Sequence, residues 1–518
     1  MSAPGRPYLL LTVFTAGLTT LAVELSASRL LGNIFGTSNL VWANVIGLIL
    51  LYLAAGYFIG GRWADRSPHA RTFYGLLVVA AFLAGLVPLV ARPVLRFAAD
   101  AMATLDAAVV GGSFLAVLIL FSAPVTLLGC ASPFAIRLAI TDPAQAGQVS
   151  GRIYAISTLG SLVGTFAPVL VFIPWIGTTR TFLVFAGLLF LVAWLGLLAA
   201  DRRRALWALL LPAVVAGAAW FTLSGSLRPV EGLIPASEVE SEYNFIQVIQ
   251  RGDTRYLLLN EGQGIHSVYS PNRLETFGTW DYFLAAPYFS DPPAPVTGLA
   301  VVGLAAGTIP KQFTAVYGSI PIDGFEIDGA IVETGRRFFD MTEPNLSVHV
   351  EDGRWGLAHS GRQYAVIAVD AYRLPYIPWH LTTKEFFQEA RAHLTADGVL
   401  VINVGRTFTD RRLIDTLAGT LRAVFPAVHA VDVPNSFNTI LYATVQPTRA
   451  ATLAANRARL PAEAHPLLRS VLDRAAQNLQ PDPASTTVFT DDWAPIEQLT
   501  NALVIDFFLG GQADDLFK

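Results

Sequence analysis

The sequence predicts a multi-spanning α-helical membrane domain followed by an α/β domain built on a mostly parallel, doubly wound sheet. Of its 518 residues, 53% are hydrophobic and only 14% are charged, and the mean hydropathy is +0.49. Such values suit a membrane protein better than a soluble enzyme. The long apolar runs end near residue 223. Beyond that point short apolar strands alternate with amphipathic helices, which is the pattern of a parallel sheet covered on both faces.

The membrane domain is expected to occupy residues 1–223 with about seven helices. A spanning helix needs roughly 20 apolar residues. No run has the charged start and small-residue cleavage site of a removable signal peptide, so the first span is expected to be retained. The candidate spans lie at approximately 8–31, 38–60, 72–91, 107–130, 153–175, 181–200 and 205–223.

The basic loops between these spans predict a multi-pass protein of the cell membrane with a cytoplasmic N-terminus. Seven crossings would place the C-terminal domain outside, and one crossing more or fewer would reverse that, so its side stays open. Glu24 and Arg29 lie within the first apolar run. Charges at that depth are costly and often functional, although pairing with other helices or a place near the interface explains them equally well.

The α/β half is expected to begin with a small β subdomain. Residues 224–236 have the composition of a linker, and residues 237–292 contain two or three strands followed by a connecting helix in "TFGTWDYFLAAPYF". Residues 293–518 then form the main α/β domain. Its strands are expected at 298–305, 322–328, 346–352, 364–371, 398–405, 428–433 and 439–445.

Polar residues and glycines follow four consecutive strands of the predicted sheet. In such sheets the ligand binds beyond the carboxyl ends of the strands. Gly303 and Gly307 form a turn that lets a ligand approach the backbone, and Glu326 follows at about the spacing of an acid that binds ribose hydroxyls. Asp352 and Asp370 end the next two strands. Helix capping explains any one acid equally well, but the set predicts a nucleoside-type ligand.

Other classes of site find little support. There is no GxGxxG motif, which favours an adenosine-containing cofactor over a dinucleotide. Cys130 is the only cysteine, and the eight histidines show no ligand spacing, so no metal is expected. The net charge of −4 and the lack of a basic cluster with aromatics argue against nucleic acid as a partner. The expected partners are the lipid bilayer and a small molecule, and homo-oligomerisation stays open.

The C-terminal half resembles the spermidine synthase family of aminopropyltransferases, in particular the branch fused to a multi-spanning membrane region. The resemblance runs from about Ser241 to Phe508. It implies a Rossmann-like fold of the class I methyltransferase type and binding of decarboxylated S-adenosylmethionine. The motifs that carry it include "YNFIQV", "LNEGQGIHSVYS", "TWDYFLAAPYF", "VVGLAAGT", "FEID", "VEDGR", "YAVIAVDAY" and "TDDWAPIE".

The resemblance also implies a role for each residue at the strand ends. Glu326 would hold the ribose, and Asp352 with Gly353 would meet the adenine. Gly303 and Gly307 would line the nucleoside. Asp370 would receive a proton from the acceptor, a small-molecule amine or polyamine. Such a base is needed because an ammonium ion is not nucleophilic.

Some of the residues at the positions expected to bind the substrates differ from the family pattern. Ala305 and Ala306 stand where the family has an aspartate that meets the amine of the donor, and Arg373 replaces an acid that holds a diamine. A cation at this position would repel a polyamine and can instead bind a carboxylate or phosphate. A surface position for Arg373, or an ion pair with Asp370, is equally compatible with the sequence. The remaining candidates for substrate binding are His266, Trp280, Asp281, Tyr372 and Glu497.

Three functions are therefore compatible with the sequence. The leading one is a membrane-anchored transferase that moves an aminopropyl group from decarboxylated S-adenosylmethionine to an amine. The second is a non-catalytic domain that senses a nucleoside or polyamine, or that is coupled to transport. The third is a methyltransferase that uses intact S-adenosylmethionine, because loss of the aspartate in the glycine turn weakens selection for the decarboxylated donor.

Overall fold

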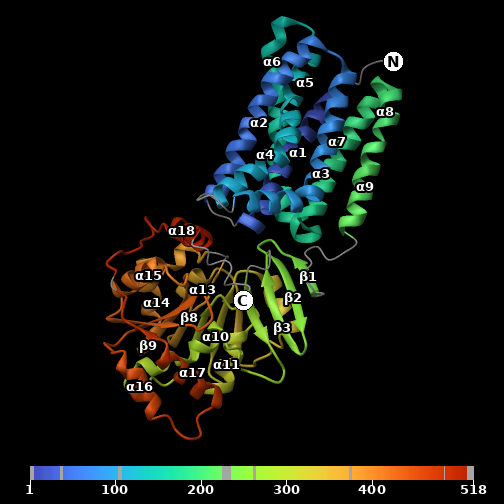
Figure 1. The fold of residues 1–518 in the computed structure, drawn as a ribbon. Helices are drawn as coiled ribbons and strands as arrows, with labels where there is room; N and C mark the ends of the chain where they lie inside the picture. The colour runs from blue at the N-terminus through green and yellow to red at the C-terminus, as the bar shows by residue number, and fades with distance from the viewer. Residues whose placement is uncertain are drawn as a thin grey trace. The chain divides into compact units, whose positions relative to one another are not determined.

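The computed structural model of the chain describes residues 5–35, 39–102, 108–223, 235–260, 264–372, 376–483 and 485–509. The chain divides into two compact units (Figure 1). One comprises residues 1–228 with 240–243, and the other comprises residues 229–239 with 244–518.

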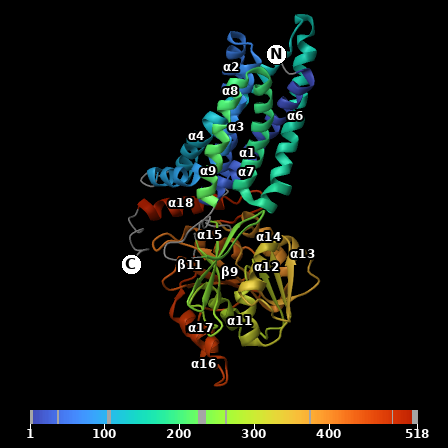
Figure 2. The same ribbon diagram turned by 90° about the vertical axis from the view of Figure 1, so that its right-hand side faces the viewer.

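The first unit is a bundle of long helices that lie side by side (Figures 1 and 2). Six runs of described residues are long and apolar enough to cross a membrane. One of them, Pro143–Ala200, has 58 residues and contains two of the predicted spans. Gly177, with φ +80°, divides that run into two helical segments. The helices are α1 (Arg6–Phe35), α2 (Asn39–Arg66), α3 (Ala70–Met102), α4 (Ala108–Gly129), α5 (Ala131–Ala139), η1 (Pro143–Gln145), α6 (Ala146–Ala167), η2 (Pro168–Phe172), α7 (Ile173–Ala200), α8 (Arg202–Ala208) and α9 (Leu210–Leu223).

Glycines allow the closest helix contacts in this bundle. A Cβ atom on Gly164 of α6 would overlap the carbonyl of Leu18 in α1. Gly56 of α2 approaches Gly129 and the carbonyl of Thr126 at the end of α4 in the same way. Small residues of this kind let helix backbones pack closely.

Gly164→Ala is expected to lower the melting temperature of the purified chain in detergent, because the added methyl group forces α1 and α6 apart. Gly151→Ala in the same helix is the matched control, since a Cβ atom there meets nothing within 4 Å. The control should melt at or slightly above the wild-type temperature, because alanine is favoured over glycine in a helix by about 1 kcal/mol. Equal melting temperatures for the two variants would contradict this packing.

Arg137 and Arg29 are among the arginines of this unit that have partners within the described residues. Arg137 pairs with Asp65 at 3.2 Å, and both side chains are largely exposed. Arg29, one of the two charges predicted within the first span, donates to the backbone carbonyls of Ser241 and Glu242. The segment 240–243 is thereby hydrogen-bonded to α1.

The second unit begins with a small four-stranded sheet, where the sequence predicted two or three strands. Its order is β1-β2-β3-β4. A turn at Gly252, with φ +63°, joins β2 to β3. The predicted connecting helix is a short α10 (Thr279–Tyr282) followed by the 3₁₀ helix η3 (Phe283–Phe289). The strands are β1 (Pro235–Glu240), β2 (Phe245–Arg251), β3 (Thr254–Leu259) and β4 (Ile265–Tyr269).

The main sheet has eight strands in the order β12-β10-β11-β9-β8-β5-β6-β7. The five strands from β9 to β7 in this order run parallel, whereas β10, β11 and β12 pair in antiparallel fashion. The result is a Rossmann-like, methyltransferase-type α/β fold. The strands are β5 (Leu299–Val302), β6 (Ile322–Glu326), β7 (Leu346–Val350), β8 (Tyr364–Val369), β9 (Leu394–Gly405), β10 (Ala427–Asp432), β11 (Asn438–Thr444) and β12 (Leu479–Gln480).

Strand β8 is apolar throughout because helices cover both faces of the sheet. Ile367 and Val369 belong to one buried cluster, together with residues of α14, α15 and α18. Val366 and Ala368 belong to the other, together with residues of η3 and α17. The helices of this unit are α11 (Thr308–Tyr317), α12 (Gly329–Phe338), α13 (Gly353–His359), η4 (Trp379–Leu381), α14 (Lys384–Ala392), α15 (Arg412–Arg422), α16 (Ala451–Ala458), α17 (Pro466–Gln477) and α18 (Ile496–Leu509).

Candidate active site

The strand order places a topological switch point between β5 and β8. The chain passes from β5 to β6 and β7 on one side, and then returns to place β8 and β9 on the other side. Ligands of open α/β sheets bind outside the carboxyl ends of the strands at such a point. Gly303 follows β5, Glu326 ends β6, Asp352 follows β7 and Asp370 follows β8. All four predicted positions therefore lie at one edge of the sheet.

Direct contacts join these four strand ends. Gly303 has φ +89°, and a Cβ atom there would lie 2.6 Å from the Cα of Ala371 and 2.7 Å from the carbonyl carbon of Asp370. The amide of Ala305 donates to Oε2 of Glu326 at 2.9 Å. A Cβ atom on Gly353 would lie 2.6 Å from Cγ1 of Val302. The end of β5 is thus packed against the ends of its neighbours.

Asp370 is held by two hydrogen-bond donors. Nδ2 of Asn403 donates to Oδ1 of Asp370 at 2.9 Å, and the side chain of Trp280 also hydrogen-bonds the carboxylate. Burial raises the pKa of Asp370 to about 7, and the two donors oppose that rise. Asp370 is therefore a carboxylate that can gain and lose a proton near neutral pH.

The structure changes the interpretation of Trp280 and adds Asn403. Trp280 was predicted as a substrate contact, but it is only 8% exposed and bonds to Asp370. Asn403 lies in β9, which pairs with β8. Its place in "GVLVINVG" offered one signal, because an amide interrupts an otherwise apolar strand. Both residues now belong to the surroundings of the carboxylate.

Glu326 is buried at the end of β6 and accepts two backbone hydrogen bonds. Ala305 donates to one carboxylate oxygen at 2.9 Å, and Asp328 donates to the other at 3.1 Å. Burial raises the pKa of Glu326 to about 7, although both amides favour the ionised form. Because a carboxylate has about four acceptor positions, two remain for hydroxyl donors such as those of a ribose.

Glu326→Gln is expected to weaken binding of methylthioadenosine by about tenfold, because an amide group there would point its own donor at the N–H of Ala305 or Asp328. The dissociation constant is measured by calorimetry on the full chain in detergent. Glu333→Gln on the exposed face of α12 is the control and should bind as the wild type does. Unchanged affinity in Glu326→Gln would remove this residue from the nucleoside site.

Asp352 has the helix-capping role that the sequence left open for it, and its contact with the adenine stays a prediction. Its carboxylate caps α13 by accepting from the amides of Arg354 and Trp355 at 3.0 and 3.1 Å. The other oxygen hydrogen-bonds Nε2 of His380 at 2.9 Å. This bond to His380 is the main reason that the pKa of Asp352 lies below its ordinary value. Asp352 therefore remains a half-exposed anion beside the switch point.

Arg354 holds together the chain segments that lie next to Asp352. Its guanidinium pairs with Glu389 of α14 at 2.7 Å and with Asp491 at 2.8 Å. Thr383, the N-cap of α14, also donates to Asp491 at 2.7 Å. The "TDDW" loop is thus bound to two helices that border the site.

Asp281 requires a correction, because the structure gives it a structural role rather than contact with a substrate. Its side chain is fully buried. Five donors within hydrogen-bond distance satisfy the carboxylate, which therefore orders its own turn and ties α10 to α11 and α17. These donors are the amides of Thr276 and Phe277, the hydroxyl of Thr276, the amide group of Gln312 and the guanidinium of Arg474.

The other predicted residues are placed as follows. Gly307 has φ +86° and begins α11, where a Cβ atom would lie 2.6 Å from Cγ of Met341. Nε2 of His266 in β4 is buried and has no hydrogen-bond partner among the described residues. Burial lowers the pKa of His266 to about 4, so its ring is neutral at pH 7. Tyr372 donates to the carbonyl of Asn403 at 3.0 Å.

Two of the residues predicted to bind the substrate, Glu497 and Arg373, remain untested by these contacts. Glu497 lies half-buried in the first turn of α18, next to the buried Ile496. Arg373 lies outside the described residues. Within the part of the chain that is described, no group of three or more His, Cys, Asp or Glu side chains is arranged to hold a metal ion.

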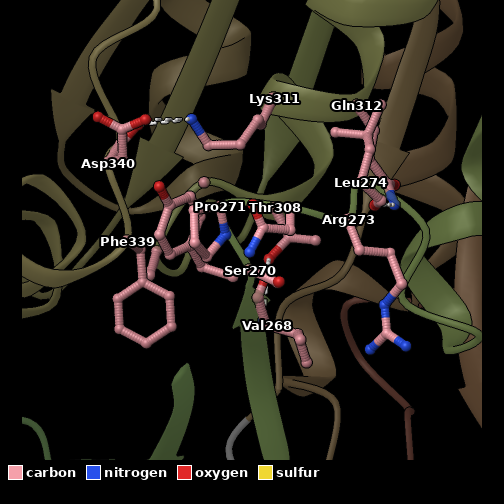
Figure 3. Close-up of a pocket in the computed structure, with 14 residues that line it drawn as sticks. Val268, Ser270, Pro271, Arg273, Leu274, Thr308, Lys311, Gln312, Phe339 and Asp340 are labelled. Atoms are coloured by element: carbon pink, nitrogen blue, oxygen red, sulfur yellow. Dashed lines mark hydrogen bonds and ion pairs between the residues drawn. The ribbon is translucent and has the colours of Figure 1, made fainter. Parts of the chain in front are cut away.

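A separate pocket of about 310 Å³ borders the glycine turn (Figure 3). The loop after β4 and the first turn of α11 form its walls, and Gly307 is one of the residues that line it. Lys311 extends across one side of the pocket toward Asp340, which it meets at 3.5 Å. Asp370, Glu326 and Asp352 are not among the lining residues.

The fold is Rossmann-like, and the acids predicted to bind a nucleoside lie together at its switch point. Comparison with known proteins then identifies the family. Residues 320–452 match the spermine/spermidine synthase domain. A protein named "probable polyamine aminopropyl transferase" from Bifidobacterium longum is 32% identical over 309 residues, which cover 55% of this chain and 68% of that protein. The chain belongs to the spermine/spermidine synthase family, which confirms the resemblance predicted from its motifs.

More distant similarities include a methyltransferase and a solved structure. The human eEF1A lysine and N-terminal methyltransferase is 28% identical over 162 residues, which cover 29% of this chain and 23% of that protein. A crystal structure of a "probable spermidine synthase" from Corynebacterium glutamicum aligns with a TM-score of 0.38 and 20% identity, covering 50% of this chain and 98% of that one.

Proposed function

We propose that this protein is a membrane-anchored aminopropyltransferase that moves the aminopropyl group of decarboxylated S-adenosylmethionine to an amine. The observation that carries the proposal is Asp370 at the switch point. It is a carboxylate with a pKa of about 7, oriented by Asn403 and Trp280, and packed against the glycine turn through Gly303. Membership of the family supports the type of reaction.

The proposed chemistry is a single displacement. The lone pair of the acceptor nitrogen forms a bond to the methylene carbon next to the sulfonium. The carbon–sulfur bond breaks, its electron pair stays on sulfur, and methylthioadenosine leaves. Asp370 takes the proton that the amine must lose to be nucleophilic. Alignment of the amine with the sulfonium supplies much of the rate enhancement.

The residues at the strand ends would bind the donor. Glu326 has two acceptor positions for the ribose hydroxyls. Asp352 is already ionised and oriented by His380, so it can accept from the adenine amino group. The left-handed backbone at Gly303 and Gly307 shapes the turn that approaches the nucleoside.

The turnover number should rise with pH through about pH 7 and reach a plateau near pH 8. The pKa of Asp370 is raised, so the carboxyl is mostly protonated at pH 6 and cannot accept the proton of the amine. At pH 6 the turnover number is expected to be about a tenth of the plateau value. Glu326 titrates in the same range but should affect the KM of the donor. A turnover number that stays flat down to pH 5 would contradict Asp370 as the base.

A specific observation also favours a second function, methyl transfer from intact S-adenosylmethionine. The glycine turn from residue 303 to residue 308 contains no acid to meet the amine of a decarboxylated donor. A human methyltransferase is also 28% identical to this chain over 162 residues.

One experiment separates the two functions. The full chain in detergent is incubated with either donor and a panel of amines, including amines that carry a carboxylate, and the products are identified by mass spectrometry. Aminopropylated amine together with methylthioadenosine supports the proposal. Methylated product with S-adenosylhomocysteine supports the second function, and binding without product supports a sensing domain.

We infer that the first unit anchors the chain in the membrane as a multi-pass domain. If both segments of Pro143–Ala200 cross the bilayer, the described helices make seven crossings and the two ends of the chain lie on opposite sides. A reporter fused after Lys518 tests this. A signal from outside the cell supports seven crossings and means that the donor must cross the membrane, whereas a cytoplasmic signal supports six.

A further inference from the structure

Three hydrogen bonds in series lead to the carboxylate of Asp370. The hydroxyl of Ser436 donates to Oδ1 of Asn438 at 2.7 Å. Nδ2 of Asn438 donates to Oδ1 of Asn403 at 2.9 Å. Nδ2 of Asn403 donates to Oδ1 of Asp370 at 2.9 Å. Each bond therefore has its donor on the side away from the carboxylate.

The register of three strands produces this series. Val369 of β8 pairs with Ile402 of β9, so Asp370 lies beside Asn403 at the ends of these parallel strands. Asn403 pairs with Ile440 of β11, and Gly405 pairs with Asn438, so the two asparagines are diagonal neighbours. The same strand ends that position the carboxylate therefore also position its donors.

The series has a fixed direction. An amide accepts at one end and donates at the other, so turning Asn403 over would aim its oxygen at Asp370 and its donor at Nδ2 of Asn438. Both contacts would then be unfavourable. Asn403 is only 5% exposed, which makes unpaired groups there costly. The orientation of Asn438 thus determines that of Asn403.

We propose that Ser436, Asn438 and Asn403 form an orienting relay that fixes the direction of the Asp370 carboxylate and keeps it able to accept the proton of the attacking amine. This rests on the proposed function of the site. Asn403 and Asn438 are positioning residues, because they act on the reaction through Asp370. The competing explanation is that the two asparagines only join β9 to β11.

Few other groups act on the Asp370 carboxylate, so a change in the relay should be detectable in its pKa. Trp280 hydrogen-bonds Asp370 from α10, and Tyr372, two residues further along the chain, interacts with it electrostatically. Among the described residues, no charged side chain contributes to the pKa of Asp370. Of its two donors, Asn403 lowers that pKa more than Trp280 does.

Three variants test the relay at increasing distance from Asp370. In a plot of turnover number against pH, the acid limb is the rise at low pH. Asn403→Leu should move this acid limb up by about one pH unit, because one hydrogen bond to a charged group is lost. At pH 7 its turnover number should fall about fivefold and recover for the most part at pH 9, with the KM of the donor within threefold of wild type. Asn438→Leu should shift the limb less and Ser436→Ala least, while Ser436→Thr keeps the hydroxyl and should match the wild type.

Asn456→Leu is the control for loss of a buried asparagine. Asn456 is 1% exposed and bonds to the carbonyls of Tyr288 and Ser290. This control should lower the melting temperature without moving the acid limb. The relay is overturned if Asn403→Leu and Asn438→Leu are folded and bind the donor, yet their acid limbs coincide with that of the wild type.

A second measurement does not depend on turnover. Because Asp370 keeps its proton up to about pH 7 in the folded chain and only to about pH 4 when unfolded, it makes stability fall as pH rises through this window. Asn403→Leu should extend the fall to higher pH, and the extension should vanish when combined with Asp370→Asn. Absence of turnover in the wild type would count against the proposed function alone, whereas an unchanged pH window in Asn403→Leu would count against the relay alone.

Discussion

Asp370→Asn should lower the turnover number by 10²–10⁴-fold, which is the usual contribution of a positioned base. The substitution preserves the shape of the side chain but removes the group that takes the proton from the amine. Binding of methylthioadenosine should stay within about tenfold of wild type, because Gly303 contacts Asp370 through its backbone and the nucleoside is held by other strand ends. Turnover is measured by methylthioadenosine release and binding by calorimetry.

The change at Asp370 should not unfold the chain. The carboxylate is desolvated, so its ionised form above pH 7 opposes folding, and the neutral asparagine removes that cost. The melting temperature at pH 8 is therefore expected to equal or exceed that of the wild type. Asp473→Asn on α17, which disturbs an ion pair with Arg457 on α16, serves as the control and should keep full turnover. Parallel losses of binding and turnover in Asp370→Asn would contradict a role as base.

Gly303→Ala should have the largest effect on the site as a whole. A Cβ atom at this position would lie 2.6 Å from the Cα and 2.7 Å from the backbone nitrogen of Ala371, and neither atom can move without displacing β8. The left-handed φ of +89° adds further strain. We expect a loss of roughly 3–5 kcal/mol in unfolding free energy, together with loss of donor binding. Denaturant unfolding of the full chain in detergent measures the first, and calorimetry measures the second.

Gly318→Ala separates the effect of backbone strain from the effect of steric overlap. Gly318 also has a left-handed φ, of +82°, but a Cβ atom there meets nothing within 4 Å. Its substitution should cost about 1–2 kcal/mol for the backbone conformation alone and leave donor binding intact. If the two variants lose the same stability and both bind the donor, Gly303 does not hold the end of β5 against Asp370.

The positions at the strand ends could be predicted because they depend on local pattern and on one rule of fold. Apolar strands with terminal acids identify Glu326, Asp352 and Asp370, and the rule that parallel strands expose their carboxyl ends at one edge brings them together. The motifs around them were also sufficient to identify the family.

The surroundings of these acids could not be predicted, because they depend on which strands become neighbours. Asn403 and Asn438 are 35 residues apart and meet only because β11 lies beside β9. Asp281 looked like a substrate contact in the sequence. Gln312 and Arg474, which satisfy its carboxylate, lie 31 and 193 residues further along the chain. Such contacts are set by tertiary packing, and the periodicity of hydrophobic residues in the sequence does not reveal them.

We propose that this chain transfers an aminopropyl group at the edge where these strand ends meet, with Asp370 as the base. A single turnover tests it most directly, with the full chain in excess over decarboxylated S-adenosylmethionine that is isotopically labelled in its aminopropyl carbons. One label should enter the amine for each methylthioadenosine released, and Asp370→Asn should retain the bound donor unreacted. If the wild-type site is fully occupied by the donor and every amine is supplied, yet the label stays in the donor, this proposal is contradicted.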